Sequence, residues 1–208
     1  MSVHIRACGI GDIDAAASVL ASAFEDDPYV GWLLPDSWSR VARARWMFSA
    51  VTRHHLLHGH VDIAVDADGA VRGAALWTPP GCWRHTVRSQ VRMLSDLLKA
   101  FGPRIPLLGL ADRQKQRMHP SEPHWYLQAI GTSPAARGLG YGRSLLESKL
   151  ALCDREGVSA FLETSNKSNL AYYERFGFTV FDEITMHFGG PRAWLMWRPP
   201  QPGGRSVI

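Results

Sequence analysis

The sequence predicts a single α/β domain built around one mixed, mostly antiparallel sheet. Short strand-like segments are interleaved with longer segments of helical periodicity along the whole chain. A strand, a glycine-rich turn and a helix follow one another over residues 124–156, which is typical of a crossover between parallel strands. With 208 residues, 46% of them hydrophobic, the chain is long enough for one buried core. We expect one domain over residues 1–198 and a tail rich in proline and glycine over residues 199–208.

The first part of the chain predicts one strand followed by three helices. Residues 3–7 alternate between polar and apolar side chains, as a half-buried strand does. Apolar side chains then recur at helical spacing over residues 13–24. Pro28 interrupts this pattern, so a separate short helix is expected over residues 29–34, and residues 37–57 predict one long helix.

A hairpin and a helical region come next. Residues 61–65 and 70–77 have the pattern of two strands, and Gly69 between them favours a tight turn. Residues 83–118 have helical periodicity, but a glycine and two prolines at residues 102–106 interrupt it, so at least two helices are expected. The remaining expected elements are, in order, a strand at 124–130, a helix ending near Glu156, a strand at 160–164, a helix at 169–176, and an antiparallel pair formed by residues 178–188 and 194–198.

The charge distribution suits an anionic ligand and does not call for nucleic acid. The chain has 23 Lys and Arg against 19 Asp and Glu, a formal net charge of +4. The densest basic cluster before the glycine-rich turn consists of Arg84, His85, Arg88 and Arg92. Its spacing predicts a solvated helix face, and a site for a phosphate group or an acidic partner is the alternative.

The cysteines and the apolar segments indicate the compartment. Cys8, Cys82 and Cys153 are widely spaced and form no C-x-x-C pair, which is typical of a reduced intracellular protein. The sequence shows neither the pattern of a secretory leader nor an apolar run of about 18 residues. We therefore expect a cytoplasmic protein without a membrane partner.

Two histidines raise the question of a metal site. His54 and His58 lie four residues apart, which places them on one helix face. No Glu accompanies them in an H-E-x-x-H pattern, and no Cys lies near them. We therefore expect no metal.

The most informative motif is the run I-G-T-S-P-A-A-R-G-L-G-Y-G-R-S-L-L, from Ile130 to Leu146. Gly138, Gly140 and Gly142 keep side chains away from the backbone where a strand passes into a helix. Unpaired N–H groups and the positive end of the macrodipole at such a helix start bind anions, and a diphosphate fits well. The spacing matches neither the dinucleotide motif G-x-G-x-x-G nor a Walker loop. A glycine-rich turn that serves packing alone is the alternative.

The spacing Arg137-x-x-Gly140-x-Gly142 resembles the coenzyme A pyrophosphate loop of the GCN5-related N-acetyltransferase (GNAT) superfamily. The resemblance implies the GNAT fold, with helices on both faces of the sheet, and acetyl-CoA as cosubstrate. It also implies roles for two positions upstream of the glycines. The backbone N–H of Ile130 would polarise the thioester carbonyl, and the backbone around Thr132 would pair with the pantetheine arm.

A second block, over residues 162–178, resembles the last motif of the same superfamily. It has Asn166 seven residues before Tyr173, followed by Gly177 and Phe178. The resemblance implies that Tyr173 is the general acid, because a thiolate leaving group gains from a nearby proton donor. The alternative is a tyrosine that packs on Phe176 or Phe178. The coenzyme-binding residues implied by both motifs are Ile130, Gly131, Thr132, Arg137, Gly138, Leu139, Gly140, Tyr141, Gly142, Arg143, Asn166 and Tyr173.

The acceptor amine must lose a proton before it attacks, and several acids are candidates for the general base. Glu163 leads them, because it lies on a strand beside the expected coenzyme cleft, where partial burial would raise its basicity. A structural salt bridge is an equally good interpretation of Glu163. Glu122, Asp26 and Asp27 are further candidates.

Four residues are candidates for binding the acceptor. Asp26 and Asp27 lie in the loop after the first helix, where they would attract a cationic amine, and exposed loop acids without a role are the alternative. Among the tryptophans, Trp77 and Trp125 are our candidates for an aromatic pocket lining, although core packing explains most tryptophans.

Five strings resemble the puromycin N-acetyltransferases of actinomycetes in the same order along the chain: A-L-W-T-P-P, E-P-H-W-Y-L, G-V-S-A-F-L-E-T-S, Y-E-R-F-G-F-T-V and G-P-R-A-W. The resemblance implies transfer of acetyl to a primary amine of a small molecule, such as an aminonucleoside antibiotic. Asp27 departs from that family's pattern, where an aromatic hydroxyl stands near the acceptor, and residues 83–118 match it poorly.

Other functions remain open at this level. An acyl-CoA-binding regulator would keep the glycine loop without transferring acetyl. An acetyltransferase for protein N-termini or lysines would need an open groove, whereas residues 83–118 look like a lid over a small molecule. The expected partners are thus acetyl-CoA and a small amine, and the sequence leaves a monomer or a homodimer open.

Overall fold

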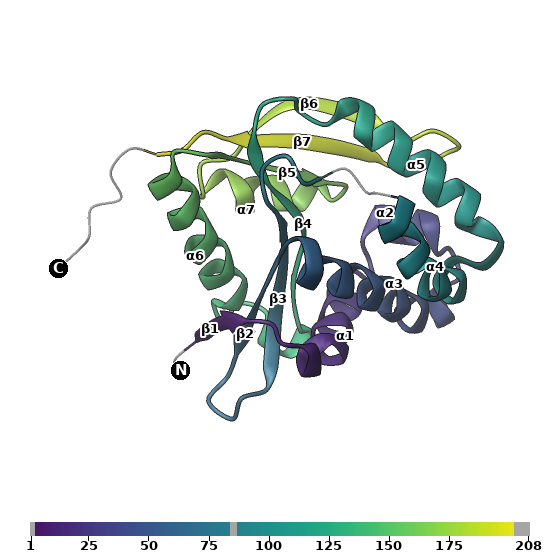
Figure 1. Ribbon diagram of the computed structural model, residues 1–208, viewed down its shortest axis with the longest axis horizontal. Coiled ribbons are helices and arrows are strands. Elements are labelled where there is room, and N and C mark those ends of the chain that lie inside the picture. Colours follow the sequence, from purple (N-terminus) through teal and green to yellow (C-terminus); the bar gives the residue numbers. More distant parts are fainter. Residues whose placement is uncertain (1–2, 84–86, 202–208) are drawn as a thin grey trace.

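The computed structural model describes residues 3–83 and 87–201. They form one seven-stranded sheet with helices packed against both faces, as the sequence predicts (Figure 1). Arg84, His85 and the tail beyond residue 201 lie outside the described residues, as do the side chains of Arg88 and Arg92. Within the described ranges, no helix is both long and apolar enough to cross a membrane.

The sheet is antiparallel except at its centre. Only β4 and β5 run parallel, and the helix α6 (Tyr141–Glu156) connects them. The strands, in spatial order, are β1 (His4–Ala7), β2 (His60–Val65), β3 (Val71–Thr78), β4 (His124–Thr132), β5 (Ser159–Thr164), β7 (Arg192–Arg198) and β6 (Thr179–Thr185).

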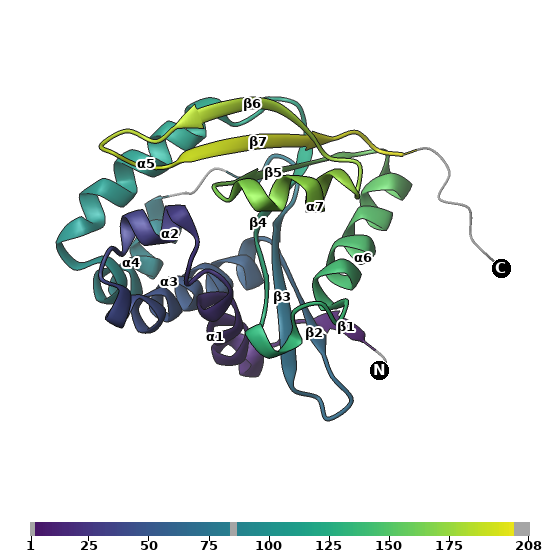
Figure 2. The same cartoon turned by 180° about the vertical axis from the view of Figure 1, so that it is seen from behind.

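Two groups of helices cover opposite faces of strands β2–β4. Neighbouring residues on a strand point to opposite faces, and this division is visible in the core. Ile63 and Ala74 pack in the cluster that contains residues of α1 and α3, whereas Ala64 and Ala75 pack in the cluster of α6. Figures 1 and 2 show α1 and α3 on one side of these strands and α6 on the other. The other helices are α1 (Ile13–Ala23), α2 (Pro28–Leu33), α3 (Ser37–His58), α4 (Val87–Phe101), α5 (Ile105–Met118) and α7 (Leu170–Glu174).

The expected strands and helices are present, with differences at their ends. Residues 83–118 give α4 and α5, separated by a short 3-10 turn that begins at Gly102, whose φ of 51° ends the α-helical run. The strand expected over residues 178–188 ends at Thr185. It stops there because Phe188 and Gly189, with φ values of 59° and 72°, turn the chain back into β7.

The two central strands separate halfway along their length. β4 pairs with β5 only as far as Leu127, which lies opposite Leu162. Beyond that point β4 stays paired with β3 up to Thr132, and β5 stays paired with β7 up to Thr164. A bulge in β4 at Gln128 marks the start of the separation. The result is a wedge-shaped opening in the middle of the sheet.

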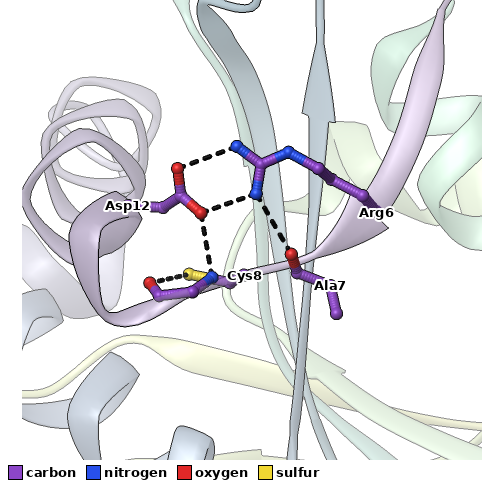
Figure 3. Close-up of polar contacts among 5 residues, drawn as sticks. Arg6, Ala7, Cys8 and Asp12 are labelled. Carbon is purple, nitrogen blue, oxygen red and sulfur yellow. Dashed lines mark hydrogen bonds and ion pairs between the residues drawn. The ribbon is translucent and has the colours of Figure 1, made fainter.

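An ion pair joins the first strand to the first helical turn (Figure 3). The Arg6 guanidinium donates to both carboxylate oxygens of Asp12, at 2.6 and 2.9 Å. The Gly9 N–H donates to the same carboxylate at 2.8 Å. These bonds, first the one from Arg6 and then the one from Gly9, lower the pKa of Asp12 to about 2.

We expect Asp12→Asn to lower the free energy of unfolding by about 1 kcal/mol at neutral pH, because a largely exposed pair is screened by solvent. The lowered pKa means that this contribution is complete above the ordinary Asp value of about 4 and disappears as the pH falls towards 2. Urea titrations of both proteins at several pH values measure it. Asp14→Asn, two residues further in the first turn of α1, is the control and should cost less; an equal loss would contradict the assignment.

Candidate active site

The glycine-rich turn presents a helix start with free N–H groups. α6 begins after Gly140, which has a φ of 89°, and Gly138 has a φ of 78°. The first N–H to enter the helical pattern belongs to Ser144, which donates to the Gly140 carbonyl at 2.9 Å. In the part of the chain that the structure describes, the N–H groups of residues 141–143 meet no acceptor. This is the arrangement that an anion needs.

The third glycine, Gly142, lies close to side chains of neighbouring elements beside this helix start. A Cβ atom at Gly142 would lie 3.3 Å from the Tyr172 hydroxyl and 3.5 Å from Cγ2 of Thr132. Arg137 and Leu139 are exposed on the turn, whereas Arg143 is bonded to Glu147 at 2.8 Å. The Tyr141 side chain is buried under the sheet, so this residue offers the site only its backbone.

A cavity of about 570 Å³ lies where β4 and β5 separate. Residues 127–130 of β4 and residues 162–165 of the β5 end line opposite sides of it. Helices α2, α3, α4, α5 and α7 contribute further walls. Three residues that the sequence singled out, Ile130, Glu163 and Tyr173, therefore meet in one cavity.

Tyr173 offers a protonated phenol to this cavity. Its side chain is buried, with the ring 5.4 Å from that of Tyr172 and 6.1 Å from that of Phe178. Burial raises the pKa of Tyr173 well above its ordinary value, and Tyr172 and Asp27 add to the effect. Among the described residues, the Tyr173 hydroxyl has no hydrogen-bond partner, so it is available as a donor.

Glu163 forms a buried ion pair with Lys115, and no sequence motif predicts this partner. The Lys115 Nζ lies 2.8 Å from Oε2 of Glu163, and the Tyr126 hydroxyl donates to Oε1 at 3.3 Å. The same ammonium lies 4.7 Å from the ring centre of Tyr29. Burial acts to lower the pKa of Lys115, but Glu163 and the two tyrosines outweigh it and raise that pKa well above its ordinary value.

The acidic loop residues have different positions from those expected. The Asp27 carboxylate caps α2 by accepting from the N–H groups of Tyr29 and Val30 at 2.9 and 3.0 Å. Its other oxygen accepts from the Ser165 hydroxyl at 2.9 Å, so Asp27 joins α2 to the end of β5 at the rim of the cavity. Asp26 is exposed and lies outside the cavity lining, which argues against its acceptor role.

The two tryptophans require a correction. Trp77 is fully buried in the cluster beneath α6, and Trp125 lies in the same cluster with its Nε1 donating to Glu156 at 2.9 Å. Neither lines the cavity, because their positions on β3 and β4 direct them to the face of α6. Both are core residues, and the prediction that they bind the acceptor is wrong.

The remaining candidates also lie outside the cavity. Asn166 caps a short 3-10 turn, with its Oδ1 accepting from the N–H of Ser168 at 3.0 Å. Glu122 is exposed. The rings of His54 and His58 are 4.9 Å apart, but over the described ranges no three potential metal ligands cluster together.

Comparisons with known proteins point to one family. The model of the acetyltransferase (GNAT) family matches residues 17–178. An uncharacterized N-acetyltransferase of Schizosaccharomyces pombe is 32% identical, in a match that covers 83% of this chain and 73% of that protein. A Corynebacterium glutamicum structure described as histone acetyltransferase HPA2 and related acetyltransferase is 29% identical, with a TM-score of 0.72 and coverage of 99% and 100%.

A more distant structure shares the fold. The ribosomal-protein-S18-alanine N-acetyltransferase of Escherichia coli is 16% identical, with a TM-score of 0.55 over 100% of this chain and 99% of that one.

The family model and the S. pombe relative show that the chain belongs to the GNAT family of acetyltransferases. Enzymes of this family use acetyl-CoA as the acetyl donor, and the protein is an acyltransferase of this type.

Gly140→Val should raise the dissociation constant of coenzyme A by at least about 100-fold. A β-branched residue cannot keep a φ of 89°, and each N–H bond lost to a charged diphosphate costs about 1.5–3 kcal/mol. Titration calorimetry with coenzyme A measures the change.

Gly69→Val is the matched control, because Gly69 has a φ of 80°, and a Cβ there, as at Gly140, meets open space. It lies in the turn between β2 and β3, so it carries the same backbone strain at a distance from the site. Unchanged affinity in Gly140→Val would rule out the turn as the diphosphate site.

Proposed function

We propose that the protein transfers acetyl from acetyl-CoA directly to a primary amine of a small molecule, with both substrates bound together. The observation that carries this proposal is the meeting of Ile130, Glu163 and Tyr173 in one cavity at the separated strands. Helices α4 and α5 wall the cavity, which favours a small acceptor over a protein chain. The stretches that resemble puromycin N-acetyltransferases support a primary amine of a small molecule as the acceptor.

The residues around the glycine turn fit coenzyme A. The free N–H groups of residues 141–143 suit its diphosphate, and Gly138, Gly140 and Gly142 leave room for it. Arg137, exposed beside the turn, adds positive charge. We assign the thioester end to the backbone of residues 130–132, where β4 has left β5. When bound, acetyl-CoA supplies an activated acyl group and a thiol leaving group.

Two side chains of the protein carry out the proton transfers. Glu163 lies at the cavity wall as the acceptor of the amine proton, directly or through water. Tyr173, kept protonated by burial, donates a proton to the leaving sulfur. Holding the amine against the thioester contributes more than either group, on the order of 7–11 kcal/mol of barrier lowering.

The cysteines support direct transfer without a covalent enzyme intermediate. Burial raises the pKa of Cys8 to about 11 and that of Cys153 to about 12, so both stay protonated and weakly nucleophilic. Cys82 is exposed and lies outside the cavity lining.

Tyr173→Phe should lower kcat by about 100-fold and leave the dissociation constant of acetyl-CoA within about twofold, because only a proton donor is lost. Thiol release measures kcat, and calorimetry measures binding. Tyr172→Phe removes a neighbouring hydroxyl and should change kcat little. Equal kcat values for Tyr173→Phe and the unmodified enzyme would remove the general-acid assignment.

Two variants separate a base from a structural ion pair at Glu163. Glu163→Gln leaves the Lys115 ammonium buried without its partner, so we expect a loss of about 3–5 kcal/mol in stability together with a fall in kcat of about 100-fold. The double variant Glu163→Gln, Lys115→Met removes both charges and should recover most of the stability. Its kcat should stay low. Recovery of kcat in the double variant would show that Glu163 serves the fold alone.

A further inference from the structure

The cavity has two chemically different ends. Among the side chains that the structure describes, which in α4 are those of residues 93–101, every lining residue from α3 and α4 is apolar: Met47, Phe48, Val51, Met93, Leu94, Leu97 and Phe101. The first half of α5 continues this wall with Ile105 and Leu108. The second half of α5 is polar, and there Lys115 meets Glu163. We call the nine apolar residues the sleeve.

The sleeve is held in place by contacts behind it. The Arg43 side chain on α3 donates to the Ala100 carbonyl of α4 at 2.6 Å, and Arg53 pairs with the buried Asp96. Phe101 is fully buried at the end of α4. The two helices are thus fixed side by side, so the sleeve exists before any acceptor arrives.

The polar end already holds a primary ammonium, that of Lys115. Its surroundings are the Glu163 carboxylate at 2.8 Å and the face of Tyr29 at 4.7 Å, and the Tyr126 hydroxyl bonds the same carboxylate. A carboxylate and an aromatic face are the groups that recognise alkylammonium ions. The charged residues described in the lining are three carboxylates, Asp27, Asp112 and Glu163, against the two cations Arg113 and Lys115, so an acidic excess remains for an amino group.

We propose that the acceptor is a primary amine with an elongated apolar body, which lies in the sleeve while the amino group lies at the Glu163 end. This inference rests on the proposed function and names the acceptor class. The seven lining side chains described on α3 and α4 offer no hydrogen-bond partner to a hydroxyl or ether oxygen, so a polar body such as an amino sugar loses its water there without compensation. An alkyl body gains from every methylene buried.

Two series of linear amines test the inference on the unmodified protein. One series runs from propylamine to octylamine, and the other has the same lengths with ether oxygens in the chain. Calorimetry with coenzyme A present should show affinity rising roughly fourfold per methylene until the sleeve is full. Each ether oxygen should weaken binding roughly tenfold. Equal affinity of the two series, or no binding of either, overturns the inference.

A pair of variants on α4 localises the effect. Leu97 lines the cavity, whereas its neighbour Leu98 is 51% exposed and lies outside the lining. Leu97→Asn should reduce the gain per methylene to about half, and Leu98→Asn should leave it unchanged. An equal gain in both variants would place the alkyl chain elsewhere and overturn the inference.

Thiol release distinguishes this inference from the proposed function. Alkylamines that bind with the expected dependence on length but release no thiol would overturn acetyl transfer to such amines and leave the binding site intact. Equal turnover of the alkyl and ether series would keep acetyl transfer and overturn the apolar acceptor.

Discussion

Beyond Leu127 and Leu162 the two central strands exchange no further hydrogen bonds, and the arrangement of the whole site follows from that separation. The opening does not fray, because β3 and β7 hold the two separated strands on their outer sides. α1 also packs closely here: a Cβ at Gly131 would lie 2.6 Å from that of Ala23, so only glycine allows this approach. The backbone groups that face the opening need partners, and a ligand with amide groups can supply them.

The charges on the two sides of this opening are of opposite kinds. The start of α6 presents N–H groups and the positive end of a helix, which suit a diphosphate. The cavity lining behind it contains Glu163, which pairs with Lys115, and Asp112, together with Tyr29 and Tyr173, which stay protonated because burial raises the pKa of each. In the proposed reaction, an anionic coenzyme and a cationic amine would therefore be attracted to separate places and would approach each other only where the strands part.

The sequence is sufficient for features that depend on local backbone demands. Gly138 and Gly140 could be assigned to a turn before a helix start because a positive φ at such a place leaves a pattern in the sequence itself. The contact between Lys115 and Glu163 joins residues from distant segments, one of them in a region without a motif, so no local pattern marks it.

Trp77 could not be assigned to a face either. The residues of β3 from Gly73 to Thr78 are buried on both sides, and a strand covered on both faces shows no alternation of polar and apolar residues. For Asp27 the sequence could not separate two roles, because both a helix cap and a ligand for a cationic amine require an acidic side chain.

The segment that carries α4 and α5 lies between β3 and β4 in the chain, whereas Ile130, Glu163, Tyr173 and the glycine turn all follow it. The groups that would choose the acceptor and the groups that would move the acetyl group thus occupy different stretches of sequence. Substitutions in residues 93–108, a stretch that ends before Lys115, would reshape the acceptor range while Ile130, Glu163, Tyr173 and the glycine turn stay unchanged. With this division, substitutions in one segment would be enough to change the accepted amine. The same segment is therefore the place to introduce mutations that redirect the enzyme to new amines.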